Sequence, residues 1–312
     1  AIYYPRPLHR QPCFQGLGDF PGGNYASYAN CLSVDGTCVG GASATALSTS
    51  EADFEAFRWR ADTGMVYLGD LPGHLFAGSV LGLSADGSVA VGWSSSASGD
   101  NTVWGFPYGE AFRWTESGGM VGLGDIPGGD FLSVARDVAD DGDFIAGNGN
   151  EPSTTQSQTL RSVTWTSATG WVIHGGSDSP HSFFLAGSRD GQWAVGRRIT
   201  LGTPGDQETI RWSTAGGYEV VHTVPYDITE SSGVLPYSVS DAGALVGGDF
   251  YHSYPAYQAF EWTDSAGLQS LGDLSGGTLG SYALAITRDG ALIVGVGTSD
   301  SGNEAVLWDE QR

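Results

Sequence analysis

Histidine, tyrosine and arginine side chains recur between residues 174 and 252 and could together act on an acidic sugar. An arginine could neutralise the carboxylate of a uronate while a histidine or tyrosine abstracts the neighbouring α-proton, as in a polysaccharide lyase. No fixed motif ties these residues together, so separate structural roles are the competing interpretation, and we favour a non-catalytic function over a lyase or hydrolase. The candidate catalytic residues are His181, Arg197, His222, Tyr226 and His252.

Two short segments are rich in aromatic rings and suit glycan binding. The apolar faces of sugars stack on aromatic rings, and neighbouring hydroxyls, amides and carboxylates can bind sugar hydroxyls. The alternative is that the rings cover the outer ends of their own structural units. The candidate ligand-binding residues are Trp104, Phe106 and Tyr108 in the first segment and Tyr251, Tyr254 and Tyr257 in the second.

A cluster of carboxylates at Asp140, Asp141 and Asp143 offers oxygen ligands for calcium. No complete EF-hand loop surrounds these residues, so a solvated turn is the alternative. Calcium is the one cofactor that the sequence suggests.

The chain has three cysteines, Cys13, Cys31 and Cys38, and could therefore form one disulfide and keep one thiol. Cys31 and Cys38 flank the Asp35-Gly36 turn with an offset that is marginal for a disulfide. Cys13 could pair with either of them, and the sequence leaves the pairing open. Their spacing fits no zinc site.

A tryptophan motif recurs along the whole chain. Glu110-Ala-Phe-Arg-Trp114 is a typical copy, in which a polar residue, a small residue, an apolar residue and a variable residue precede the tryptophan. Six copies of one unit, each about fifty residues long, are therefore present. Their tryptophans are Trp59, Trp114, Trp165, Trp212, Trp262 and Trp308.

Each repeat contains signals for four short strands. Before each tryptophan, two apolar runs flank an Asp-Gly pair or a close relative, which is typical of a tight hairpin turn. After the tryptophan comes an alternating run such as Gly64-Met-Val-Tyr67. Counting the tryptophan strand, each unit supplies the four strands of one propeller blade. The sequence predicts an all-β, six-bladed β-propeller.

The two ends of the chain predict how the ring closes. Only four residues follow Trp308, so the sixth repeat lacks its fourth strand. Residues 14–23, Phe14-Gln-Gly-Leu-Gly-Asp-Phe-Pro-Gly-Gly23, match Met120 to Gly129 of the second repeat. We expect this N-terminal strand to complete the last blade and remove exposed sheet edges. Residues 14–312 then form one propeller domain, and residues 1–13 form a proline-rich arm that packs on it or enters a partner subunit.

The connections between strands sort onto two faces of the predicted ring. The Asp-Gly turns emerge on one face, and the longer, more variable loops emerge on the other, which we call the loop face. Before the connection between repeats, the motif Leu-Gly-Asp supplies Asp19, Asp70, Asp125 and Asp273, which we expect to cap turns by accepting backbone N–H bonds. The third and fourth repeats lack this motif, which either drift or a local site explains.

The composition excludes some partners. The 35 acidic residues outnumber 13 basic residues, all arginine, and give a formal net charge of −22. This charge repels nucleic-acid phosphates and anionic membranes at long range. No apolar run reaches the roughly 20 residues of a transmembrane helix.

The tandem pattern resembles the bacterial extracellular HAF-repeat proteins. It is carried by Ala-Phe-x-Trp, by Gly-Met-x-x-Leu-Gly-x-Leu-Pro-Gly-Gly and by Val-Ser-x-Asp-Gly-x-Val-x-Val-Gly, between Phe14 and Trp308. The resemblance implies a propeller-like fold and a secreted or cell-surface location, and it supplies no catalytic residues. We therefore predict a binding or adhesion protein for a glycan or an extracellular protein. A structural subunit that assembles through its N-terminal arm, and a polysaccharide lyase or hydrolase, are the alternatives.

Overall fold

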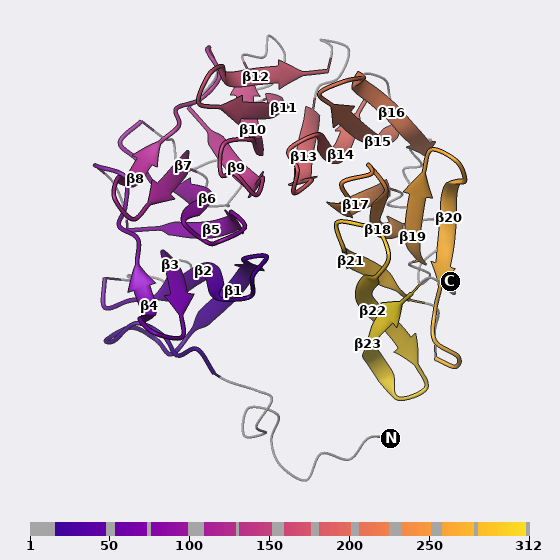
Figure 1. The fold of residues 1–312 in the computed structure, drawn as a ribbon, viewed down its shortest axis with the longest axis horizontal. Coiled ribbons are helices and arrows are strands. Elements are labelled where there is room, and N and C mark those ends of the chain that lie inside the picture. The colour runs from indigo at the N-terminus through magenta and orange to yellow at the C-terminus, as the bar shows by residue number, and fades with distance from the viewer. Residues whose placement is uncertain are drawn as a thin grey trace.

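The chain folds into six antiparallel sheets arranged around a common axis, with the first strand of each sheet innermost (Figure 1). The computed structural model describes residues 16–47, 54–73, 76–98, 109–128, 131–151, 159–175, 181–200, 206–224, 233–250, 258–277 and 280–309. This part of the chain contains strands and turns and no helix. The predicted six-bladed β-propeller is confirmed.

The blades are numbered one to six in chain order. Blades one and two comprise β1 to β4 (Ser27–Leu32, Cys38–Ala44, Phe54–Arg60, Gly64–Tyr67) and β5 to β8 (Gly78–Leu83, Val89–Ser94, Glu110–Thr115, Gly119–Gly122). Blades three and four comprise β9 to β12 (Ser133–Val138, Ile145–Glu151, Thr159–Thr166, Gly170–His174) and β13 to β16 (His181–Gly187, Trp193–Ile199, Gln207–Ser213, Gly217–Val224). Blades five and six comprise β17 to β20 (Gly233–Val239, Leu245–Phe250, Gln258–Thr263, Gly267–Gly272) and β21 to β23 (Tyr282–Ile286, Ile293–Ser299, Gly302–Trp308).

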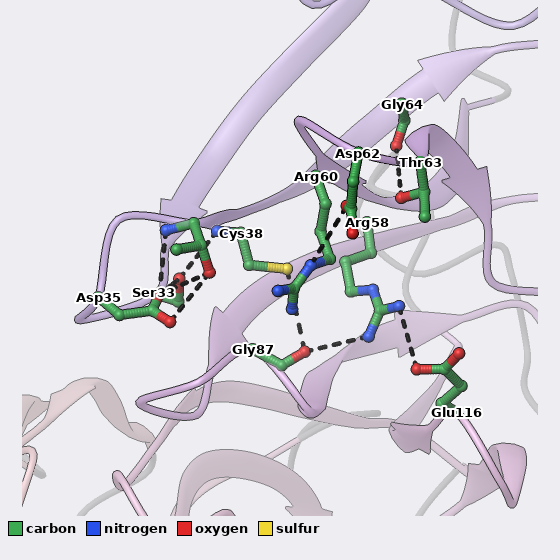
Figure 2. A network of polar contacts seen from close by, with 11 residues as sticks. Ser33, Asp35, Cys38, Arg58, Arg60, Asp62, Thr63, Gly64, Gly87 and Glu116 are labelled. Carbon is green, nitrogen blue, oxygen red and sulfur yellow. Dashed lines mark hydrogen bonds and ion pairs between the residues drawn. The ribbon is translucent and has the colours of Figure 1, made fainter.

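A tight turn joins the first two strands of every blade, as the sequence predicts. In blade one, the Asp35 carboxylate accepts a hydrogen bond from the Thr37 N–H at 3.0 Å, and the Ser33 hydroxyl accepts one from the Cys38 N–H at 2.9 Å (Figure 2). The glycine of each turn has a positive φ, a conformation that other residues adopt only with strain. These φ angles lie between 65° and 80° at Gly36, Gly87, Gly142, Gly191, Gly243 and Gly290.

The innermost strand of every blade also carries a β-bulge at the same position. The extra residue lies two positions before the last paired residue of the strand. In blade two, for example, it is Leu81, and the last paired residue is Leu83. A bulge bends its strand and re-aims a side chain. The six bulged residues therefore form one level around the axis. They are Asn30, Leu81, Arg136, Leu185, Tyr237 and Leu284.

Apolar side chains fill the seams, which are the contacts between consecutive blades. In the first seam, Leu83, Phe112 and Trp114 of blade two pack with Cys38 and Ala56 of blade one. The tryptophans of blades three to six likewise pack in the seam with the preceding blade. The repeated tryptophan therefore serves packing between blades.

In three blades, an arginine on the third strand forms a hydrogen bond with the turn of the next blade and so links the two blades across their seam. Arg58 Nη1 donates to the carbonyl of Gly87 in the next blade at 3.3 Å, and its Nη2 pairs with Glu116 at 3.5 Å (Figure 2). The guanidinium carbon also lies 4.7 Å from the centroid of the Trp114 ring. Equivalent bonds run from Arg113 to Gly142 at 2.9 Å and from Arg211 to Gly243 at 3.1 Å. We call this arrangement the arginine clamp.

Two of the four Leu-Gly-Asp aspartates, Asp125 and Asp273, cap the connections between blades, as predicted. The prediction is wrong for Asp70, which accepts a hydrogen bond from the Tyr67 hydroxyl while its other carboxylate oxygen is buried without a partner among the described residues. Asp125 accepts hydrogen bonds from the N–H groups of Ile126 at 2.7 Å and Leu132 at 2.6 Å. Asp273 accepts them from Gly280 and Thr298, both at 2.7 Å. Each of these carboxylates therefore holds the first residues of the following blade.

The ring has a break between blades one and six (Figure 1). Blade six has three strands, and none of the described residues supplies a fourth, so the expected closure by the N-terminal strand is not confirmed. Phe14 and residues 1–13 lie outside the described residues. Residues 16–23 lie against blade one, where Phe20 N–H donates to Ser43 Oγ at 3.2 Å and Ser27 Oγ donates to the Gly18 carbonyl at 2.7 Å.

Cys31 and Cys38 are both free, so they do not form a disulfide with each other. Cys31 pairs with Gly40 in the sheet, while the Cys38 sulfur faces the Gly87 carbonyl of the next blade at 3.9 Å. Cys13 lies outside the described residues. In the described part of the chain, no helix is long and apolar enough to cross a membrane.

Candidate ligand-binding site

Three of the five candidate catalytic residues are described, and all three belong to blade four. His181 begins β13, Arg197 lies in β14 and His222 lies in β16. Tyr226 and His252 lie outside the described residues. The same holds for all six aromatic candidates, Trp104, Phe106, Tyr108, Tyr251, Tyr254 and Tyr257.

Arg197 lies in a row of cross-strand neighbours on one side of blade four. It pairs with Phe183 in β13 and with Thr209 in β15, and Thr209 pairs with His222 in β16. Residues that pair directly across antiparallel strands project from the same side of the sheet. The Thr209 hydroxyl donates to the Val234 carbonyl of blade five at 3.1 Å. This row therefore faces blade five.

His181 and Gln207 lie one row closer to the loop face, on the same side of the sheet, because side chains two residues apart share a side. The ring centroids of His181 and Phe183 lie 6.3 Å apart. Arg197 Nη1 donates to Gln207 Oε1 at 3.4 Å, and the Arg197 guanidinium carbon lies 5.5 Å from the centroid of the Phe183 ring. A planar cation thus rests on an aromatic ring beside an amide.

Tyr237, the bulged residue of the innermost strand of blade five, lies near enough to Arg197 for the charge of the guanidinium to act on its phenol. Burial raises the pKa of the Tyr237 phenol, and the nearby Arg197 charge partly offsets that rise. Tyr237 was not among the residues predicted from the sequence, which included Tyr226, although Tyr237 aligns with the bulged residues of the other repeats. We call His181, Phe183, Arg197, Gln207 and Tyr237 the arginine site.

The arginine site presents one positive charge and several neutral hydrogen-bonding groups. Burial lowers the pKa of His181, and the charges of Arg161 and Arg197 lower it further, so its imidazole is neutral at pH 7. Burial also lowers the pKa of Arg197. With Tyr237 protonated and Arg197 charged, the site can bind an anion through charge-assisted hydrogen bonds. A neutral His181 can also accept a proton.

His222 and His174 lie apart from this site. His222 is at the far end of the row, on the outermost strand, and burial lowers its pKa. His174 belongs to blade three and packs against Trp212 of blade four, with 4.4 Å between ring centroids and 37° between the ring planes. Its Nε2 lies 2.7 Å from Thr164 Oγ1, and burial lowers its pKa to about 4. His174 therefore takes the place of the arginine clamp in this seam.

The three aspartates predicted to bind calcium have separate partners. Asp140 pairs with Arg288 of blade six at 3.0 Å, and the same arginine pairs with Asp241 at 2.7 Å. The Asp141 carboxylate accepts from the Asp143 N–H, and the Asp143 carboxylate accepts from the Ser167 N–H, both at 2.9 Å. Across the described ranges, no group of three or more His, Cys, Asp or Glu side chains could hold a metal ion.

The fold is similar to several solved propellers at low sequence identity. The β-propeller domain of the Trilobed protease from Pyrococcus furiosus, reported with an open velcro topology, aligns with a TM-score of 0.56 and 11% identity over 92% of this chain and 82% of that chain. Acylaminoacyl peptidase in complex with Z-Gly-Gly-Phe-chloromethyl ketone aligns with a TM-score of 0.54 and 10% identity over 91% of this chain and 45% of that chain.

Prolyl oligopeptidase B from Galerina marginata aligns with a TM-score of 0.53 and 11% identity, over 91% of this chain and 42% of that chain. The chain thus spans less than half the length of these two peptidases. No family model and no curated protein matches the sequence. At these identities the likeness establishes the β-propeller fold.

Proposed function

We propose that this chain is a ligand-binding propeller of a secreted or cell-surface bacterial protein. It binds a glycan, or an extracellular protein partner, through its loop face. The observation that carries this proposal is the arginine site, which places Arg197, Phe183 and Tyr237 at the inner end of the seam between blades four and five. Rings beside a few polar groups are typical of sugar-binding surfaces. The resemblance to HAF-repeat proteins supports the extracellular location.

The experiment that tests this function is a glycan and polysaccharide array probed with the purified chain, with and without calcium. Retention on at least one glycan that is lost when Tyr237 is changed to Ala, in a variant that unfolds at an unchanged temperature, supports binding through this face. An array without any signal rejects glycan binding and directs attention to a protein partner.

A lyase or hydrolase is the second candidate, and the neutral His181 favours it. In a site where Arg197 neutralises a carboxylate, an uncharged imidazole nearby could take up a proton from the adjacent carbon. The solved propellers of similar fold belong to peptidases, which is compatible with a role beside hydrolytic chemistry. A product assay on every array hit distinguishes the two functions, because a lyase releases unsaturated ends and a binding protein releases nothing.

We also propose that the N-terminal strand, within residues 14–23, completes blade six and closes the ring. The bond from Ser27 Oγ to the Gly18 carbonyl, 2.7 Å, has counterparts where one blade leads into the next: Ser133 to Gly124 at 2.6 Å and Ser281 to Gly272 at 2.7 Å. Residues 16–23 therefore occupy the place of a connection that arrives from a preceding blade. The only blade without a fourth strand among the described residues is blade six.

The exposure of equivalent side chains supports the same closure. Leu32 of blade one is 51% exposed, whereas its counterpart Leu83 in blade two is fully buried by blade one. Val294 of blade six is 46% exposed, whereas its counterpart Val91 is buried in the seam with blade three. Two apolar faces are thus left over, one for each side of a sixth seam.

A further inference from the structure

The partners of the arginines single out Arg197. Six of the ten described arginines pair with a carboxylate, namely Arg58, Arg60, Arg161, Arg198, Arg211 and Arg288. Arg113 and Arg189 donate to backbone carbonyls. Within the described residues, only Arg136 and Arg197 have neither kind of partner, in a chain with 35 acidic side chains.

The Arg197 side chain is also half-buried, so water solvates its charge only in part. Its neighbours are the Gln207 amide and the Phe183 ring, both uncharged. Its pKa is lowered by burial, whereas the pKa of Arg288 is raised by the hydrogen bond and the charge of Asp241. A buried guanidinium without a counter-ion is costly, and a bound anion would remove that cost.

The charge and the hydrogen-bonding groups of the site indicate which class of anion it binds. A guanidinium binds a carboxylate through two parallel hydrogen bonds, and the Tyr237 hydroxyl can donate a third. A single positive charge in a protein of net charge −22 matches a monoanion better than a doubly charged phosphate. The Phe183 ring, with its centroid 5.5 Å from the Arg197 guanidinium carbon, can contact the apolar face of the sugar that carries the carboxylate.

We infer that Arg197, with Tyr237 and Phe183, binds the carboxylate of a uronic acid residue in an acidic glycan. This inference rests on the proposed glycan-binding function and adds the chemistry of the bound sugar. Gln207 and the neutral His181 are placed to bind sugar hydroxyls next to the carboxylate. The paired arginines in the same blade, such as Arg198 with Glu208, remain structural.

The test is calorimetric titration of the full chain with methyl galacturonoside, a sugar with one carboxylate, and with its methyl ester, which keeps the sugar and removes the charge. We expect the acid to bind at least about tenfold more tightly than the ester. Arg197→Gln should abolish that preference. Arg60→Gln, which removes one equal charge in blade one, should keep it. Tyr237→Phe, which removes one hydroxyl, should weaken binding of the acid and leave the ester unchanged.

Thermal unfolding of each variant keeps loss of binding separate from loss of fold, and Tyr237→Phe still tests the site if Arg197→Gln does not fold. Equal affinity for acid and ester, or an acid preference that survives Arg197→Gln, overturns the inference and leaves glycan binding intact. Binding of a peptide through its free C-terminal carboxylate, with no binding of methyl galacturonoside, also overturns it. An array without any glycan signal instead rejects the glycan binding on which the inference rests.

Discussion

The guanidinium carbon of Arg211 lies 4.5 Å from the ring centroid of Trp262 in the next blade. It also lies 4.4 Å from the ring centroid of Trp193 in its own blade, so the cation is held between two indoles. Arg211 further pairs with Asp264 at 2.8 Å and donates to the Gly243 carbonyl at 3.1 Å. The seam between blades four and five, which carries the arginine site, therefore depends on this clamp.

Replacing Arg211 with Met should destabilise the protein by about 2 to 3 kcal/mol, because the variant loses a charge-assisted hydrogen bond and cation–π contacts. Arg60→Met is the matched control, because Arg60 makes a partly exposed pair with Asp62 at 3.7 Å and should cost less than about 1 kcal/mol. Urea unfolding of both variants measures the difference. If Arg211→Met and Arg60→Met unfolded at the same urea concentration, the clamp would contribute no more stability than the partly exposed Arg60 pair.

Leu307→Asp tests the proposed closure of the ring. Leu307 is 61% exposed in blade six, at the position where Arg58 and Arg113 lie in blades one and two. If blade one covers this face, the aspartate should lower the free energy of unfolding by at least about 1.5 kcal/mol, since a buried leucine contributes that much. Val121→Asp, on the outermost strand β8 and 55% exposed, is the control. Indistinguishable effects of the two changes would indicate an open ring.

The cap at Asp125 makes stability depend on pH. Burial raises the pKa of this carboxyl to about 6 from its ordinary value of 3.8, against the hydrogen bonds from Leu132, Ile126 and Asn150. Between these values the folded protein binds more protons than the unfolded chain, so this group's contribution to stability falls as pH rises from about 4 to 6. Asp125→Asn cannot ionise, and its stability relative to the wild type should rise across that window. Urea unfolding at pH 4 and pH 7 measures the change, and a constant difference would contradict it.

His174 should act in the opposite direction. Burial lowers its pKa to about 4 from 6.5, so below pH 6.5 the unfolded chain takes up a proton that the folded protein refuses. Its contribution to stability is therefore lost as pH falls from 6.5 to 4. His174→Gln can keep the hydrogen bond to Thr164 and should show a flatter decline over this range. Because Asp125 and His174 oppose each other in the wild type, only the single variants reveal either effect.

Local signals made most of the fold predictable. The Asp-Gly turns need only the positive φ of one glycine, and the strands beside them follow from alternating apolar residues, so both were found in every repeat. The role of Asp125 and Asp273 as turn caps was also predictable, because a carboxylate beside a connection has few other uses. The closure of the ring, which joins the two ends of the chain, stays a prediction, as do the cap at Asp19 and the arm of residues 1–13.

The site was harder to predict because it depends on which residues meet across blades. Arg197 was a candidate from its residue type, but its neighbour Tyr237 lies 40 residues further along the chain and is aimed by a bulge. His174 lies at the start of the histidine-containing region of the sequence, yet its ring contacts Trp212 and lies apart from the site. Asp140 was assigned to calcium, whereas it pairs with Arg288, which is 148 residues away in the sequence.

That distant pair has a consequence for how the protein is made. On the ribosome, Asp140 and Asp241 emerge before Arg288. In the folded protein these two carboxylates share Arg288 as their counter-ion, so they lack it until the sixth repeat is synthesised. Electrostatic repulsion should then keep the nascent inner strands apart. The last repeat therefore supplies the counter-ion that links blades three and five, and we expect a chain that ends before residue 288 to be cleaved rapidly by proteases.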